Sequence, residues 1–380
     1  MIGTRKAAAF IAIAAMVASA CSSTAATPTA APVTAAPVTA APVTAAPVTA
    51  APVACTVGVS WNNYQEERWA KWDEPAIKAA LTKAGLTYVS NDAKSSADTQ
   101  LSNVDALINQ GAKVLIILAQ DGTAIKPAVA KALAAGVPVI AYDRLIEDKG
   151  AFYITFDNVL VGKLQAAALL AVKNKGNFVV IKGNKADANA DFLRAGMVQA
   201  GLPDVGASTA DLKNVGETYT DNWDPANAQN EMAQFLTKNG NKIDIAFVEN
   251  DGMAGGVIAA LKSQGLAGKV PVSGQDGDAA ALNRVALGTQ TVDVWKDARL
   301  LGNAAGEAAV QLCAKTAMDK ITTAQGASKV FKTPGGNDVN SILITPQAIT
   351  KDNLQVVLDA KWITKETLCK DVTAGSVKGC

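Results

Sequence analysis

The chain has 380 residues, of which 49% are hydrophobic and 18% charged, a composition typical of a globular protein with two ordinary domains. Its formal net charge of +1 gives no electrostatic reason to expect nucleic acid or an anionic membrane surface as a partner. The chain contains no histidine, which excludes Ser-His-Asp and Cys-His catalysis and removes the commonest metal ligand, so we expect no metal and no cofactor.

Residues 1–20 have the pattern of a signal peptide. Arg5 and Lys6 supply positive charge, and the apolar run 7–17 is too short to span a membrane. Small residues directly before Cys21 resemble a bacterial lipobox, in which cleavage leaves Cys21 as the lipidated N-terminus. An ordinary signal peptide cut near Ala20 is the alternative. We therefore expect an exported protein at the cell surface or in the periplasm, held at the membrane by a lipid anchor only.

Residues 21–54 are predicted to form a low-complexity tether. Within them, residues 29–53 repeat Thr-Ala-Ala-Pro-Val. Proline at every fifth residue disfavours both helix and sheet. An extended tether would let a lipid-held domain move away from the membrane.

From Cys55 onward, short β-rich runs alternate with segments of helical period. The strand candidates are 56–60, 114–119, 138–143, 152–156, 178–182, 243–248, 270–273, 291–295 and 341–345. The helix candidates are 75–84, 99–110, 124–135, 162–173, 226–238, 254–263 and 300–314. Glycines are expected to end helices at Gly111, Gly136, Gly176, Gly240 and Gly265. This alternation predicts parallel βαβ units, and their number predicts two similar halves, 55–157 and 158–296.

Polar side chains recur just after the predicted strands. In open parallel sheets, ligands bind beyond the carboxyl ends of the strands. The residues at these places carry carboxylate, amide, guanidinium, ammonium and indole groups: Arg68, Trp69, Asp143, Arg144, Asp187, Asn189, Trp223, Asn250, Asp276 and Lys296. A neutral sugar needs donors and acceptors in fixed positions, and its C–H face packs well on an indole. The sequence contains neither a Walker A motif nor a dinucleotide fingerprint.

Most of these residues also have a purely structural interpretation. Arg68 could pair with Glu74, and Trp69 and Trp223 could belong to the core. N-capping is the favoured role for four aspartates at expected helix starts: Asp73, Asp221, Asp251 and Asp278.

The four cysteines after Cys21 are Cys55, Cys313, Cys369 and Cys380. An even number in an exported protein indicates disulfides. A local Cys369–Cys380 loop is the simplest pairing and leaves Cys55 with Cys313, but three pairings are formally open, as are buried free thiols.

An ordered set of segments closely resembles the periplasmic xylose-binding proteins of ABC transporters, in the wider ribose/galactose-binding group. The similarity runs from Thr56 to about Thr367. It is carried by Glu67-Arg68-Trp69, Ala141-Tyr142-Asp143-Arg144, Phe156-Asp157-Asn158, Asp187 and Asn189 before Phe192-Leu193-Arg194-Ala195-Gly196, Asn250-Asp251, Ser273-Gly274-Gln275-Asp276 and Gly288-Thr289-Gln290-Thr291.

The resemblance implies the α/β fold of type I periplasmic binding proteins: two doubly wound parallel-sheet Rossmann-like lobes joined by a three-crossing hinge. It places the crossings near Asp157, Lys296 and Ser341. The N-terminal lobe would then comprise residues 55–157 and 297–340, and the C-terminal lobe residues 158–296 and 341–380. Nine of the ten strand-end residues named above fall on sugar-contact positions, with Trp223 and Trp69 stacking from opposite lobes. The tenth, Asp143, is adjacent to them and is expected either to orient Arg144 or to contact the sugar. Asn62 and Asn63 stand where the family has acidic residues, which bears on the choice of sugar.

The resemblance further implies a monomeric, extracytoplasmic solute-binding lipoprotein that closes around a monosaccharide and delivers it to an ABC transporter permease. D-xylose is the first expectation, followed by glucose, arabinose or ribose. No enzymatic activity is expected, because Arg and Lys lie among the carboxylates and would spoil a glycosidase acid. A sugar-binding chemosensory or signalling receptor is the main alternative. A transcription regulator of the same fold fits poorly with the export signal and the lack of a DNA-binding N-terminus.

Overall fold

A computed structural model describes residues 55–380 of the chain. The predicted signal peptide, the lipidation site Cys21 and the repeat tether all lie outside the described residues.

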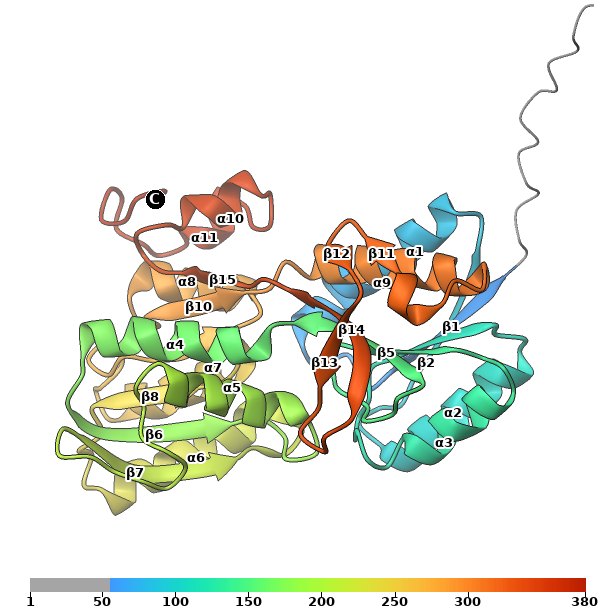
Figure 1. Ribbon diagram of the computed structural model, residues 1–380. Coiled ribbons are helices and arrows are strands. Elements are labelled where there is room, and N and C mark those ends of the chain that lie inside the picture. Colours follow the sequence, from blue (N-terminus) through green and yellow to red (C-terminus); the bar gives the residue numbers. More distant parts are fainter. Residues whose placement is uncertain (1–54) are drawn as a thin grey trace, which may run out of the picture. The chain divides into compact units, whose positions relative to one another are not determined.

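The N-terminal lobe is built on a seven-stranded sheet with the order β13-β14-β5-β4-β3-β1-β2 (Figure 1). All pairs in it are parallel except β13–β14. Helices α1 and α9 cover one face and α2 and α3 the other, each with its own apolar cluster. Its strands are β1 (Thr56–Trp61), β2 (Thr87–Asp92), β3 (Val114–Ile117), β4 (Val139–Tyr142), β5 (Ala151–Phe156), β13 (Lys329–Lys332) and β14 (Asp338–Ile344), beside the short pair β11 (Thr322–Thr323) and β12 (Gly326–Ala327). Its helices are η1 (Trp69–Asp73), α1 (Glu74–Lys83), α2 (Ala97–Asn109), α3 (Lys126–Ala134), α9 (Ala298–Cys313) and η3 (Met318–Lys320).

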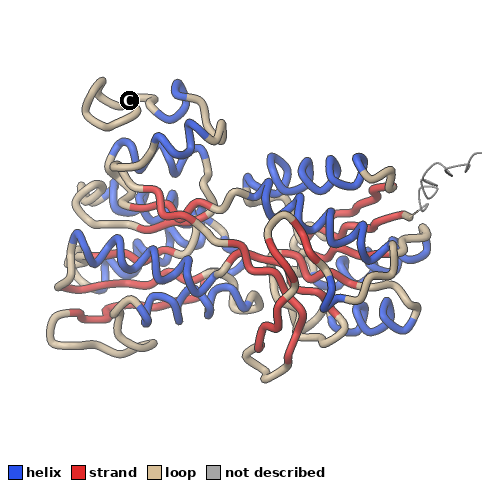
Figure 2. The backbone as a smooth tube through the Cα atoms, turned by 45° about the horizontal axis from the view of Figure 1, so that its top comes forward, coloured by secondary structure: helices blue, strands red, loops and turns tan. Residues whose placement is uncertain are grey.

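The C-terminal lobe contains the strand groups β7-β6-β8 and β15-β10-β9. A parallel bridge from Ala246 to Val272 links the two groups, and only β15 runs antiparallel to its neighbour. Helices again lie on both faces of the strands (Figure 2). The strands are β6 (Gly176–Lys182), β7 (Leu212–Tyr219), β8 (Ile245–Val248), β9 (Ser273–Gln275), β10 (Val292–Trp295) and β15 (Gln347–Ile349). The helices are α4 (Asn158–Val172), α5 (Ala188–Gln199), η2 (Asp221–Trp223), α6 (Pro225–Lys238), α7 (Asp251–Ser263), α8 (Ala279–Leu287), α10 (Gln355–Asp359) and α11 (Lys365–Leu368).

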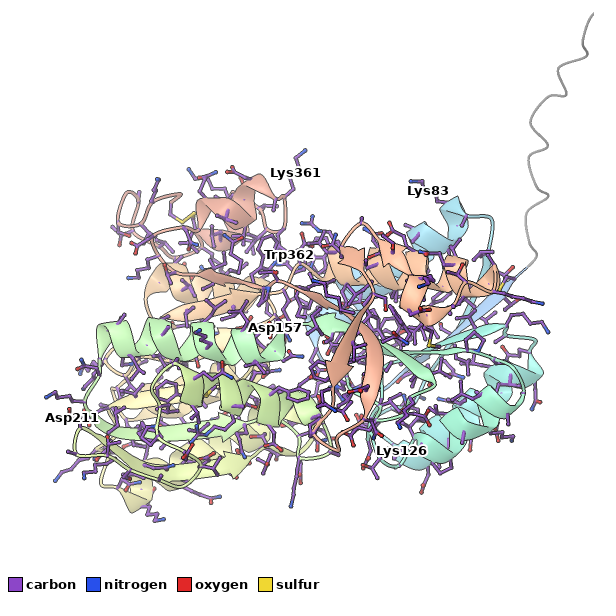
Figure 3. All side chains as sticks on the ribbon, in the orientation of Figure 1. Lys83, Lys126, Asp157, Asp211, Lys361 and Trp362 are labelled. Atoms are coloured by element: carbon purple, nitrogen blue, oxygen red, sulfur yellow. A yellow bond between two sulfur atoms is a disulfide. The ribbon has the colours of Figure 1, made fainter. Side chains whose placement is uncertain are left out.

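The chain passes between the two lobes three times, between β5 and α4, between β10 and α9, and between β14 and β15. At the first crossing Asp157 caps α4 by accepting from the amide of Leu160 at 2.9 Å (Figure 3). The third crossing differs from the expected position near Ser341. Strand β14 pairs with β5 as far as Ile344, opposite Phe156, so residues 341–344 belong to the N-terminal sheet.

Several elements differ from the sequence-based expectation. The strand expected at 270–273 is observed as β9, displaced toward Gln275. Gly176 has a positive φ of 121° but starts β6 rather than ending a helix. Strands β2 and β7 and helices α5 and α8 were not predicted. Both strands are largely half-exposed and polar, so they lack the apolar run that marked the central strands.

Two disulfides join Cys55 to Cys313 and Cys369 to Cys380, the pairing that the cysteine spacing favoured. The first ties the start of β1 to the end of α9 inside the N-terminal lobe. The second closes a short loop at the C-terminus, in the red segment that lies beside α8 in Figure 1.

Candidate functional site

Strands of both lobes end at one small cavity. Its lining comprises Glu66, Arg68, Trp69, Asp143, Arg144, Asp187, Asn189, Trp223, Asn250, Gln275, Asp276 and Lys296. All ten residues singled out from the sequence lie there, together with two that were not. The space between the side chains is about 20 Å³, room for about one water molecule.

Arg68 is the most densely paired side chain of the site and is 1% exposed. It binds Asp73 through two nitrogens at 2.9 and 3.0 Å, and its Nη1 lies 3.2 Å from Asp143 Oδ2 and 3.3 Å from Asp276 Oδ1. Burial alone would lower the pKa of Arg68, but the surrounding carboxylates hold that pKa well above its usual value. The guanidinium also lies over the ring of Trp69, 4.3 Å from its centroid. Since Asp276 belongs to the other lobe, Arg68 forms an ion pair between the lobes.

Arg144 makes a second ion pair between the lobes. Its Nε lies 2.9 Å from Asp187 Oδ2, and its Nη1 donates to the carbonyl of Ala119 at 3.2 Å. Asp187 also caps α5 by accepting from the amide of Asn189 at 3.0 Å. Burial raises the pKa of Asp187, against the lowering effect of Arg144. Each partner of this ion pair thus also makes a hydrogen bond within its own lobe.

Asn189, an uncharged residue of the C-terminal lobe, connects the lobes through a hydrogen bond to Asp143. Its amide donates to the carbonyl oxygen of Asp143 at 3.2 Å, and its own oxygen accepts from Asn158 at 2.9 Å. Thr155 donates to the same carbonyl of Asp143 at 2.7 Å. Asp143 itself has a φ of 61°, a conformation uncommon for a residue other than glycine and one that accumulates at functional sites.

Two indoles border the cavity, one from each lobe. Trp69 is fixed in the N-terminal lobe because its Nε1 donates to Glu66 Oε2 at 2.6 Å. Trp223 lies at the end of η2 with a φ of 57° and packs closely over Gly183. A Cβ on Gly183 would lie 2.1 Å from the Trp223 ring, so glycine is required there. The Nε1 of Trp223 is buried and has no hydrogen-bond partner within residues 55–380.

The remaining lining residues follow β8, β9 and β10. Asn250 caps α7 through its side-chain oxygen, which accepts from Met253 at 3.0 Å, so its amide nitrogen is left for the cavity. Lys296 is 2% exposed, and its Nζ lies 3.8 Å from Asp276 Oδ1. Asp276 therefore pairs with two cations, Arg68 of the N-terminal lobe and Lys296 at the second crossing.

The sequence analysis missed Glu66 and Gln275. Glu66 accepts from Arg144 Nη2 at 3.4 Å as well as from Trp69, and burial raises its pKa. Gln275 is 3% exposed, and its side-chain oxygen has no partner in the described part of the chain. Glu66 directly precedes the segment Glu67-Arg68-Trp69, and Gln275 lies inside the segment Ser273-Gly274-Gln275-Asp276, next to the chosen Asp276.

None of the four aspartates expected to be N-caps makes a capping hydrogen bond. Asp73 makes no capping bond and instead pairs with Arg68, which also corrects the suggested pairing of Arg68 with Glu74. Burial raises the pKa of Asp73 to about 6. Asp278 makes no capping bond either, and α7 is capped by Asn250 rather than by Asp251. The fourth, Asp221, precedes α6, which is capped by Asp224.

A pair of buried carboxyls supports the loop that carries Asp276. The amide of Gly277 donates to Asp251 Oδ2 at 3.0 Å and to Asp293 Oδ1 at 3.1 Å. Burial, followed by the negative charge of Asp278, raises the pKa of Asp293 to about 8. One carboxyl of this pair therefore keeps its proton near neutral pH and bonds to the other.

The cavity offers both hydrogen-bond donors and acceptors beside two aromatic faces, with charges paired across it. Within residues 55–380, no group of three or more acidic or cysteine side chains is placed to hold a metal ion. A search of the same residues found no helix with the length and apolar character needed to cross a membrane. The mixture of donors, acceptors and aromatic faces in the cavity suits a small uncharged ligand with many hydroxyls.

Two lobes with mainly parallel sheets, three chain crossings and a polar cavity at the carboxyl ends of both sheets define the type I periplasmic binding protein fold. The family model for the periplasmic binding protein domain matches residues 57–317. The chain belongs to this family of substrate-binding proteins.

Relatives of the chain are named for sugars. It is 38% identical to the D-xylose-binding periplasmic protein of Escherichia coli K12 over 83% of this chain and 89% of that protein. It is 34% identical to the D-xylose-binding periplasmic protein of Haemophilus influenzae over 82% of this chain and 91% of that one. A carbohydrate transporter solute-binding protein from Chloroflexus aurantiacus, solved in complex with D-glucose, superposes with a TM-score of 0.72 at 29% identity and covers 82% of this chain and 97% of its own.

Proposed function

We propose that the chain binds a monosaccharide between its two lobes, with D-xylose as the first candidate. One observation carries this proposal: donors, acceptors and indoles from the carboxyl ends of both sheets line a single cavity. Each sugar hydroxyl both donates and accepts. Asp143, Asp187 and Asp276 supply acceptors, Arg68, Arg144 and Lys296 supply donors, and the rings of Trp69 and Trp223 supply apolar faces.

The choice of D-xylose rests on the two relatives that carry its name. D-glucose, which the Chloroflexus aurantiacus protein holds, is the next candidate, followed by arabinose and ribose. Thermal-shift screening of these four sugars tests the choice, since a ligand that binds only the folded chain raises its melting temperature. The expected result is the largest shift with D-xylose, verified by calorimetric titration. A screen in which no monosaccharide shifts the melting temperature would end the proposal.

Binding proceeds by closure of the lobes. A monosaccharide is far larger than the 20 Å³ left between the side chains, so its entry requires Arg68 to part from Asp276 and Arg144 from Asp187. Sugar hydroxyls then take over part of these contacts and favour the closed state by the bonds made only there.

The closed form delivers the sugar to an ABC importer. In cells lacking this chain, uptake of labelled D-xylose is expected to fall and to return with the intact gene. Unchanged uptake with a lost behavioural response to the sugar would instead indicate a chemosensory receptor.

The anchor is a lipid on Cys21. Labelled palmitate is expected to be incorporated into the wild-type chain and not into Cys21→Ala, which would be released from the membrane. Release of both forms would point to an ordinary signal peptide.

No turnover is part of this function. Arg68, Arg144 and Lys296 pair with carboxylates of the cavity, and this pairing does not leave a free pair of carboxyls to act as acid and base on a glycosidic bond. Incubation with aryl xylosides is expected to release no phenol above the rate of heat-denatured protein.

A further inference from the structure

A second contact between the lobes lies outside the sugar cavity. Trp72 of η1 stacks on Trp362 of the C-terminal segment, with ring centroids 4.4 Å apart and planes inclined by 22°. Trp72 belongs to the N-terminal lobe, and Trp362 packs in the core around α8, β10 and β15 of the other lobe (Figure 3). Neither residue lines the cavity of about 20 Å³.

Arg299 adds to this contact from the start of α9. Its guanidinium lies 5.5 Å from the Trp72 centroid and 5.2 Å from the Trp362 centroid, within cation–π range of both. Its Nη1 also donates to the carbonyl of Ala360 at 3.0 Å. Asp297 holds the guanidinium in place through an ion pair at 2.7 Å.

Each half of the contact is coupled to one member of the Arg68–Asp276 ion pair. Arg68 directly precedes η1, the short helix that carries Trp72. On the other side, Trp362 Nε1 donates to the carbonyl of Gly277 at 2.6 Å, next to Asp276 in the chain. Movement of Asp276 away from Arg68 would therefore also carry Trp362 away from Trp72.

We propose that Trp72, Arg299 and Trp362 form an aromatic clasp that closes with the lobes and stabilises the sugar-bound state without touching the sugar. This inference rests on the proposed closure around a monosaccharide. The clasp lies beside a groove of about 1160 Å³ lined by Trp72, Trp362 and the C-terminal disulfide loop. Parting of the lobes would open that groove further and expose both rings. The clasp thereby adds to affinity through the closure equilibrium.

The test uses the full chain and D-xylose, or whichever of the four sugars the screen identifies. Trp72→Ala is expected to weaken binding about three- to tenfold, the range of an aromatic pair, mainly through faster dissociation. Trp72→Phe keeps a ring and is expected to lose less. Lys83→Ala removes an exposed side chain at the end of α1, the helix that follows η1, and is the control, expected to bind as the wild type does.

Fluorine NMR of the chain labelled with 5-fluorotryptophan separates a clasp from a fixed packing contact. Among the six tryptophans, the resonances of Trp72 and Trp362 are expected to shift when the sugar saturates the protein. Resonances that stay in place, or Trp72→Ala binding within twofold of the wild type, would overturn the clasp alone. If Trp72→Ala proves unfolded by circular dichroism, Arg299→Gln serves as the second variant with the same expected direction. A wild-type chain that binds none of the sugars would overturn the proposed function and the clasp together.

Discussion

Arg68 and Asp276 lie 3.3 Å apart across the two lobes, although 208 positions separate them in the chain. Arg68 is oriented by its own lobe, because Asp73 holds two of its nitrogens. Asp276 has a φ of 104°, in a region that L side chains rarely adopt. The two residues are thus held in position from opposite lobes, as a site requires when it must recognise a ligand in one geometry.

Asp276→Asn is expected to weaken sugar binding roughly 10- to 100-fold, since a hydrogen bond to a charged group contributes about 1.5–3 kcal/mol. The substitution keeps the shape of the side chain but removes the charge that faces Arg68 and Lys296. Calorimetric titration measures the effect. Asp211→Asn, at an exposed ion pair with Lys175 far from the cavity lining, is the matched control and is expected to bind normally. Equal affinities for the two variants would remove Asp276 from the site.

Gly183→Ala is expected to reduce binding by displacing Trp223. The added Cβ would meet the indole at 2.1 Å, and the ring must move to relieve the clash. Gly255→Ala, at a position within α7, is the control, because its Cβ would meet only ordinary contacts, the nearest at 3.4 Å to Arg284 of α8. Its expected effect is a small gain in stability from better helix propensity. The two alanine variants are compared by titration with the sugar and by circular dichroism, and unimpaired binding by Gly183→Ala would show that the ring position does not matter.

The buried Asp251–Asp293 pair is expected to make stability fall as pH rises. The folded pKa of Asp293 is raised to about 8, above its unfolded value of 3.8. Between these values the folded chain keeps a proton that the unfolded chain releases. The contribution of Asp293 to the free energy of unfolding is therefore greatest below about pH 4. This contribution declines as the pH rises from about 4 to 8, by at most about 1.4 kcal/mol per pH unit. Burial also raises the pKa values of Asp251 and Asp278, which acts in the same direction.

Asp293→Asn isolates this effect. Urea unfolding of both chains from pH 5 to pH 9 gives the difference in their free energies of unfolding, which is expected to move in favour of the variant as the pH rises. A difference that stays constant over this range would mean that Asp293 is ionised in the folded chain throughout.

The two disulfides are expected to contribute unequally to stability. Cys55–Cys313 spans 258 positions and Cys369–Cys380 spans 11. Because the entropy removed from the unfolded chain grows with loop length, the longer loop should contribute about 3 kcal/mol more. Paired Cys→Ser variants of each bridge, unfolded in urea under oxidising conditions, measure both contributions. A larger loss from the C-terminal bridge would contradict the loop-length argument.

The alternation of apolar strands and helical segments was sufficient to predict the parallel βαβ architecture. The central strands β3, β4 and β8 are buried on both faces and appear in the sequence as continuous apolar runs. The partly exposed strands β2 and β7 have no such run, so pairing with a neighbour, rather than their own composition, makes them strands. The return crossing after Ile344 was misplaced for a similar reason, since nothing local marks where β14 stops pairing with β5.

The residues of the candidate site could also be predicted from local features of the sequence. A strand end is visible in the sequence, and in a parallel sheet all strand ends of one sense meet at one edge. The residues chosen by that rule therefore line one cavity. The rule does not assign partners, and the role of Asp73 as the companion of Arg68 was missed because it depends on where the first turn of η1 directs each side chain.

The amino-acid sequence by itself determined the class of fold, the position of the strand ends and the kinds of group that gather there, because each depends on residues close together in the chain. Only the tertiary structure decided which of these groups pair, as Arg68 does with Asp276 and Trp72 with Trp362. Those pairs bring together residues from different lobes, and their energies depend on distances of a few ångströms that are set by the packing of the whole chain.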